Sequence, residues 1–175
     1  MIRRVDLQPA IDTATAILRA AEVDVEWYSC EAALVRNPEH RCAAPIGGNE
    51  LAVRLVRMRT DPNHRGDLAL GYSLVDARTH SGALATIFMD RVIWLADAAK
   101  IDVRPLLGRA IAHELGHLLL GTNAHTEAGL MRAVWSCDSL RMNDPADWTF
   151  NSHDIQTMKQ AIRLRAVPQL AKLSF

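Results

Sequence analysis

The segment from Asp102 to Gly121 constrains the fold of this 175-residue chain more than any other feature. Asp102 is a residue type that caps helix N-termini, and Pro105 fits a first turn, where its missing N–H needs no partner. Apolar side chains dominate up to Leu120, and Gly121 suits the left-handed conformation that commonly ends a helix. The segment therefore predicts one long helix that starts after Asp102 and ends at Leu120.

The patterns that precede this helix predict a mixed α/β fold. Apolar residues recur at helical spacing over residues 9–22. Alternation or a short apolar run, each typical of a strand, occurs in four places, residues 23–27, 51–55, 68–75 and 83–89. Residues 90–100 fit either a short helix or a continuation of the last strand, and we favour the helix.

The C-terminal part adds one further helix. Residues 122–150 show no sustained period, but Asn151 and Asp154 have capping-box spacing ahead of a helical pattern that ends before Pro168. No linker, repeat or low-complexity tract divides the chain. We expect an α/β fold with a single domain over residues 1–175 and a twisted mixed sheet of four or five strands.

Composition excludes several classes of protein. The chain is 49% hydrophobic and 23% charged, and it has no run of the roughly 18 apolar residues that a membrane helix needs. Twenty Lys and Arg residues balance 20 Asp and Glu residues, so nucleic acid is not expected as a partner. The N-terminus lacks the apolar stretch of a signal peptide, so the signal of an exported protein would lie outside this numbering.

The three cysteines form no paired Cys-x-x-Cys motif. Cys30 and Cys42 bracket an irregular segment, and a disulfide between them would imply an oxidising compartment and an exported protein. The alternative is a pair of reduced thiols in a cytoplasmic protein. Cys137 is left over and is interpreted as a small buried hydrophobic residue.

The long helix contains His113-Glu114-Leu115-Gly116-His117, an HExxH motif. Residues four apart lie on one helix face, so both imidazoles can bind one Zn²⁺ at roughly 2.0–2.1 Å. Glu114 points about 100° round the helix from His113, where it can accept a proton from a water that zinc acidifies. Chance would produce the motif about 0.01 times in such a chain. The motif therefore favours a metal site over two structural histidines and a solvated glutamate.

A catalytic zinc keeps an open position beside three protein ligands, so a third ligand is expected. His125 follows Gly121 by four residues, close enough for the chain to reverse at the glycine and return to the metal. Glu127 is disfavoured as the third ligand. Zinc peptidases with a glutamate ligand take it from a separate second helix, and Glu127 is too near the end of this helix for that. The aspartates that remain open as alternatives are Asp138, Asp144, Asp147 and Asp154.

Together with Gly129-Leu130-Met131-Arg132, these residues resemble the metzincin zinc endopeptidases, and the start of the last helix looks matrixin-like. The family signature is HExxHxxGxxH with a later Met-turn beneath the metal. The loop before His125 is two residues longer here. The resemblance implies a zincin-like fold, three histidine ligands, Glu114 as general base and Met131 as the Met-turn residue. Trp135 is interpreted as a core tryptophan rather than as a pocket wall.

The resemblance also implies a place for the substrate. In metzincins the strand before the zinc helix is the exposed sheet edge, and Ser81-Gly82-Ala83-Leu84-Ala85 is similar to the matching matrixin stretch. We therefore expect an extended peptide to pair with Ala83, Leu84 and Ala85. The alternative is an interior strand whose alanines serve packing.

The function expected from these residues is peptide-bond hydrolysis in proteins or peptides, with one catalytic Zn²⁺. Two alternatives stay open. A zinc endoribonuclease with three histidine ligands is disfavoured by Glu114 and by the neutral net charge. A peptide-binding module that keeps the metal without turnover is disfavoured by the intact Glu114. The sequence predicts neither the oligomeric state nor the side chain preferred beside the cut.

Overall fold

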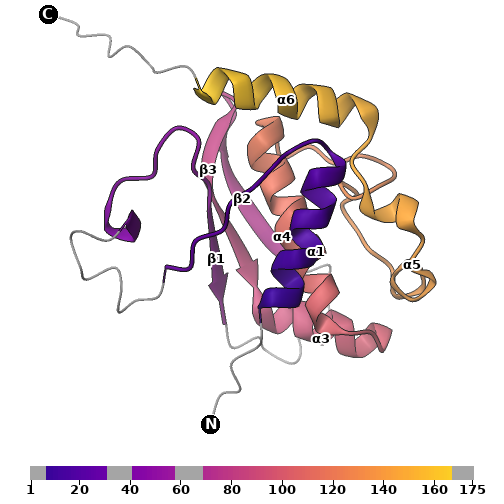
Figure 1. The fold of residues 1–175 in the computed structure, drawn as a ribbon. Helices are drawn as coiled ribbons and strands as arrows, with labels where there is room; N and C mark the ends of the chain where they lie inside the picture. The colour runs from indigo at the N-terminus through magenta and orange to yellow at the C-terminus, as the bar shows by residue number, and fades with distance from the viewer. Residues whose placement is uncertain (1–6, 31–40, 58–68, 167–175) are drawn as a thin grey trace, which may run out of the picture.

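The computed structural model describes residues 7–30, 41–57 and 69–166. They form a mixed α/β fold with a three-stranded mixed sheet and five α-helices (Figure 1). The elements in chain order, where η marks a 3-10 helix, are α1 (Gln8–Ala20), η1 (Arg41–Ala43), β1 (Ala52–Val56), β2 (Gly71–Asp76), β3 (Ser81–Phe88), α3 (Met89–Ala99), α4 (Val103–Leu120), α5 (Cys137–Met142), η2 (Pro145–Trp148) and α6 (Ser152–Ala166).

The described sheet has the strand order β1-β3-β2, so β3 is central and β2 lies at an edge. β3 runs parallel to β1 and antiparallel to β2. Ala85 of β3 is level with Val53 of β1 and with Ser73 of β2. Residues level with one another in a sheet point to the same face, so these three side chains share the face that packs on α4.

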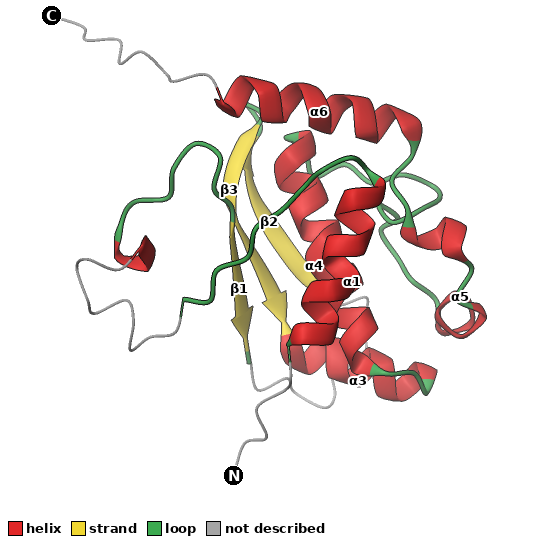
Figure 2. Ribbon diagram, viewed as in Figure 1, coloured by secondary structure: helices red, strands yellow, loops and turns green. Residues whose placement is uncertain are grey.

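The helices gather on one side of the sheet, and α4 lies at the centre of the packing (Figure 2). It contacts β2 and β3 on one side and α1 on another, and its residues Leu107 and Leu118 are fully buried. A Cβ on Gly108 would lie only 2.4 Å from the carbonyl oxygen of Ala10. The close approach of α1 to α4 therefore requires glycine at this position.

The helix predicted between Asp102 and Gly121 is confirmed. The Asp102 carboxylate accepts a hydrogen bond from the Arg104 N–H at 2.9 Å, and Gly121 has a left-handed φ of +67°. A Cβ on Gly121 would also lie 2.2 Å from the carbonyl oxygen of His80, so the turn between β2 and β3 can approach the helix end only if residue 121 is glycine. The helices predicted over residues 9–22, over residues 90–100 and after Asn151 are confirmed as α1, α3 and α6.

Three of the four predicted strands are confirmed as β1, β2 and β3, but residues 23–27 are not a strand. Their alternation does report burial, because Val23 is buried while its neighbours are exposed. The segment instead packs beside α1, where the Trp27 indole N–H donates to the Thr15 hydroxyl at 2.8 Å. The described sheet consequently has three strands rather than four or five. Residue 68, at the start of a predicted strand, and Pro168 lie outside the described residues.

The expectation that Ala83, Leu84 and Ala85 lie on an exposed sheet edge is wrong. Leu84 pairs with Ala52 of β1 on one side and with Leu74 of β2 on the other. The alanines therefore serve an interior strand, and β2 is the edge beside α4. Sequence alternation does not distinguish central from edge strands, because it reports which face is buried and not which neighbours a strand has.

The predicted disulfide between Cys30 and Cys42 is present, with the two Cα atoms 5.6 Å apart, and Cys137 is a free, partly buried thiol. The residues between the two bonded cysteines lie mostly outside the described part. Among the described helices, none combines the length and the apolar character needed to cross a bilayer.

Candidate metal centre

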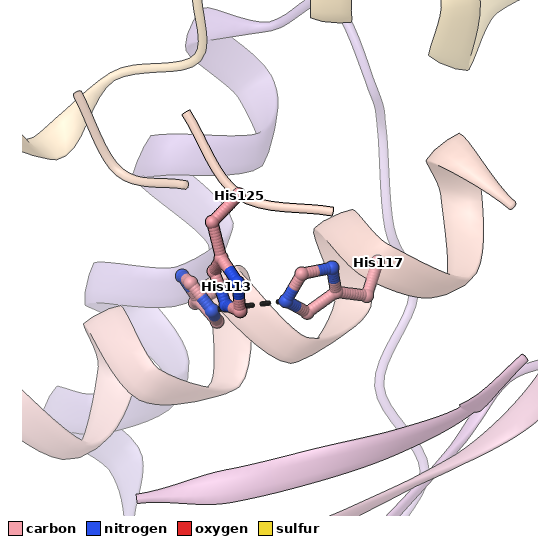
Figure 3. Close-up of side chains that lie close together, drawn as sticks. All are labelled: His113, His117 and His125. Carbon is pink, nitrogen blue, oxygen red and sulfur yellow. Dashed lines mark hydrogen bonds between the residues drawn. The ribbon is translucent and has the colours of Figure 1, made fainter. Parts of the chain in front are cut away.

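α4 and the loop that follows it bring three histidines together. His113 and His117 lie one turn apart on α4 and are buried, while His125 lies on the loop and is exposed. One ring nitrogen from each lies within 4.8 Å of the others. Figure 3 shows the three rings converging from these two elements. The predicted ligand set is therefore close enough to hold one metal ion.

The hydrogen bonds of the two buried histidines determine which ring nitrogen carries the proton. Nδ1 of His113 lies 2.8 Å from the carbonyl oxygen of Leu130, and Nδ1 of His117 lies 2.9 Å from that of Thr122. A carbonyl oxygen can only accept, so each Nδ1 is the N–H donor. Each Nε2 of a neutral ring is consequently a bare lone pair.

The two Nε2 atoms face one another at 3.1 Å, as the dashed line in Figure 3 marks. Burial keeps both rings neutral, since it lowers the pKa of His113 to about 4 and also lowers the pKa of His117. Neither Nε2 then has a proton to donate to the other. Two nitrogens bound at roughly 2.05 Å to one tetrahedral ion stand about 3.3 Å apart, which is close to the observed spacing. The site therefore fits a metal cation.

His125 reaches the site because α4 ends sharply. Gly121 donates its N–H to the carbonyl oxygen of His117 at 2.9 Å, and the chain then turns back past Thr122. The centroid of the His125 ring lies 5.4 Å from that of His113 and 4.8 Å from that of His117. Within the described part of the chain, the four aspartates considered as alternative ligands, Asp138, Asp144, Asp147 and Asp154, do not join the cluster.

Glu114 lies beside the histidines in a buried position between α4 and β2. It is 5% exposed, and burial raises the pKa of its carboxyl group to about 7. The Ser73 hydroxyl lies 2.8 Å from Glu114 Oε2, and this hydrogen bond opposes the effect of burial on the pKa. Ser73 was not identified from the sequence, because no motif relates residue 73 to residue 114. Only the register of β2 against α4 brings them together.

Met131 lies against α4 at Gly116. A Cβ on Gly116 would lie 2.7 Å from Met131 Sδ, so glycine makes room for the methionine between the two helical histidines. Met131 is 1% exposed, and the preceding residue, Leu130, supplies the carbonyl that holds His113. The turn closes where Thr126 donates its N–H to the Met131 carbonyl oxygen at 3.0 Å. Met131 is thus packed against α4 at Gly116, next to the residue whose carbonyl oxygen accepts from His113.

Trp135 is a core residue, as the sequence favoured. It is 8% exposed, and its ring packs edge-on to His113 with the centroids 5.5 Å apart. It also packs against Trp148 in an edge-on geometry, with the ring centroids 5.4 Å apart. A separate cavity of about 290 Å³ lies between the end of β2 and the loop that leads to His125, with Val75 and Ala124 among the lining residues.

Comparisons with known proteins found no match to this chain, whether against protein-family models, curated proteins or solved structures. The geometry of the three histidines and of Glu114 is therefore the basis for the functional proposal that follows.

Proposed function

We propose that this chain is a zinc-dependent endopeptidase of metzincin type. The observation that carries the proposal is the pair of unprotonated Nε2 atoms of His113 and His117, which face each other at 3.1 Å with His125 beside them. Three neutral imidazoles suit Zn²⁺ and leave a fourth position open, which is the arrangement of a catalytic site. The buried carboxyl group of Glu114, next in sequence to His113, supplies a proton acceptor.

The residues of the chain divide the chemical work. Bound zinc would supply the Lewis acidity that makes water nucleophilic near neutral pH. His113, His117 and His125 hold the ion, and the Leu130 and Thr122 carbonyls orient the first two rings. Glu114 accepts the proton of the attacking water and returns it to the nitrogen of the leaving amine. In this proposal one carboxyl group, that of Glu114, transfers the proton from the attacking water to the nitrogen of the leaving amine.

The edge strand β2 supports a peptide as the substrate. Phe88 donates its N–H to the Leu70 carbonyl oxygen at 2.8 Å, which makes Leu70 and Phe88 a hydrogen-bonded pair. Because such pairs alternate along an antiparallel ladder, Gly71 and Ser73 direct their N–H and C=O groups away from β3. An extended peptide can pair with these groups beside the metal centre. β2 therefore replaces residues 83–85 as the proposed substrate-binding strand.

The disulfide between Cys30 and Cys42 supports a location in an oxidising compartment. We propose export on this ground. The substrates of an exported peptidase would be extracellular or periplasmic proteins. Mass mapping of non-reduced peptides from the native host tests the location, since free Cys30 and Cys42 would contradict it.

A peptide-library digest tests the function directly. We expect the zinc-loaded chain to cleave internal peptide bonds, a chelator to stop cleavage, and added zinc to restore it. A Glu114→Gln variant that binds zinc but does not cleave would tie the activity to this site. Zinc binding without cleavage by the parent chain would instead favour the binding module, and chelator-sensitive cleavage of RNA would favour the endoribonuclease.

A further inference from the structure

We propose that Ser73 is a positioning residue for Glu114, through which the substrate-binding edge of the sheet orients the general base. The inference rests on the proposed peptidase function. Ser73 lies in the middle of β2, and its side chain points towards α4 rather than to solvent, with 7% of the residue exposed. It connects an element that would bind substrate with an element that carries the catalytic carboxyl group.

The contact between Ser73 and Glu114 is double. Ser73 Oγ lies 2.8 Å from Glu114 Oε2 and 2.7 Å from the Glu114 carbonyl oxygen. The hydroxyl has a single proton, which these two acceptor oxygens share, and it thereby links the backbone of α4 to the end of the Glu114 side chain. Among the described residues, Ser73 supplies the side-chain hydrogen bond to this carboxyl group. Without it, a buried carboxyl group would lose a polar partner and could adopt other rotamers.

Gly71 shapes the same pocket by having no side chain. A Cβ at this position would lie 2.9 Å from both Cγ and Oε1 of Glu114, and 2.6 Å from the Thr86 carbonyl oxygen. The two positions of β2 that face Glu114 are thus one without a side chain and one with a short hydroxyl. The first leaves space for the carboxyl group, and the second holds it at a defined place.

The backbone N–H and C=O groups of Ser73 point away from β3. Since Ser73 is a non-hydrogen-bonded position opposite Ala85, its N–H and C=O point to the free edge of the sheet. A peptide that pairs there would restrain Ser73, and Ser73 in turn restrains Glu114. Binding of substrate and orientation of the base are then linked through one residue.

Ser73→Ala keeps the backbone groups of the edge and all three histidines, but it removes the hydroxyl. We therefore expect kcat to fall by about 10- to 100-fold, which is the usual range for losing a hydrogen bond to a charged group, with KM and zinc content little changed. Ser73→Thr retains the hydroxyl and should recover most of the lost kcat. Ser81→Ala, the same substitution at an exposed position on β3, should match the parent.

A second readout does not depend on activity. A double-mutant cycle with Ser73→Ala and Glu114→Ala, followed by urea unfolding of the full zinc-loaded chain, measures the contact itself. We expect the two substitutions to be coupled by about tenfold in the unfolding equilibrium constant, or about 1.4 kcal/mol. Additive effects would mean that the hydroxyl does not hold the carboxyl group, and would overturn the proposal.

The outcomes separate the two proposals. If the parent chain cleaves no peptide, the proposed function fails and the positioning role fails with it, whatever the cycle shows. If the parent cleaves and Ser73→Ala cleaves with the same kcat, the function stands and only the role of Ser73 is refuted. A loss of kcat that threonine does not restore would also refute it.

Discussion

The helix α4 and the edge strand β2 meet at Glu114. The role proposed for α4 can be read from a short stretch of sequence, whereas the role proposed for β2 depends on a tertiary contact. α4 carries His113, Glu114 and His117 within five consecutive residues, so the chemistry proposed for it follows from helical spacing alone. β2 carries no motif, and the role proposed for Ser73 rests on its contact with residue 114, 41 positions away. A compact motif can be read from a sequence, whereas a site residue defined by packing cannot.

The largest expected effect comes from removing the proton acceptor of α4. Glu114→Gln should lower kcat by about 10²- to 10⁴-fold, which is the usual contribution of a general base, while zinc content is retained. Initial rates on a cleaved library peptide, with zinc measured on the same samples, provide the test. A rate equal to that of the parent would show that Glu114 is not the base, and the positioning role proposed for Ser73 would fail with it.

Removing a helical ligand tests α4 by itself. His117→Ala should weaken zinc binding more than about 100-fold, because even partners that only orient a ligand contribute 10- to 100-fold. His125→Ala should have a smaller effect, since that residue is exposed and lies on a loop. Competition with a chromophoric chelator measures both affinities, and His153→Ala on α6 is the matched histidine control. Equal losses at His153 and His117 would refute the assignment of the site.

A proline at the centre of the sheet tests the topology behind the edge assignment. Leu84→Pro should destabilise the fold by about 1–3 kcal/mol, because it removes a backbone donor from a strand that pairs on both sides. Leu84→Val preserves the backbone donor and should remain folded. Urea unfolding followed by circular dichroism decides between them. If Leu84→Pro is as stable as the parent, β3 is an edge strand and the substrate-binding role returns to residues 83–85.

The smallest effect concerns the contact region of α4 and β2 in the metal-free chain. Burial raises the pKa of Glu114 from 4.5 to about 7, so between these values the folded state binds more protons than the unfolded state. The contribution of Glu114 to the free energy of unfolding is therefore fully present below pH 4.5 and is lost as the pH rises towards 7. Relative to the parent, Glu114→Gln should gain stability over this window, by about 1 kcal/mol per pH unit.

The histidines do not obscure this comparison. Burial lowers the pKa values of His113 and His117, so their contribution changes in the opposite direction and is lost as the pH falls. It is present in both the parent and the variant and cancels in the difference between their free energies of unfolding. A difference that does not vary between pH 4.5 and 7 would mean that Glu114 is solvated rather than buried.

In the fold, as in the site, local features were predicted from the sequence and features set by distant neighbours were not. The helices α1, α3, α4 and α6 were predicted with boundaries close to those observed, because periodicity, caps and breakers act within a few residues. Residues 23–27 alternate like a strand but pack beside α1 without a strand partner. Residues 83–85 are a strand, but an interior one. Both errors concern the neighbours of a segment, which its own pattern does not contain.

The sequence by itself determined the long helix and the histidine pair with its adjacent glutamate. Helical spacing decides these features, so they need no knowledge of distant residues. The sequence offered His125 as third ligand and a Cys30–Cys42 disulfide as expectations with alternatives, and the structure decided between them. Only the tertiary structure decided that β2 is the edge and that Ser73 contacts Glu114. It also decided that the Leu130 carbonyl fixes the proton of His113. These features depend on strand order and register, which long-range packing selects from many arrangements with the same local pattern.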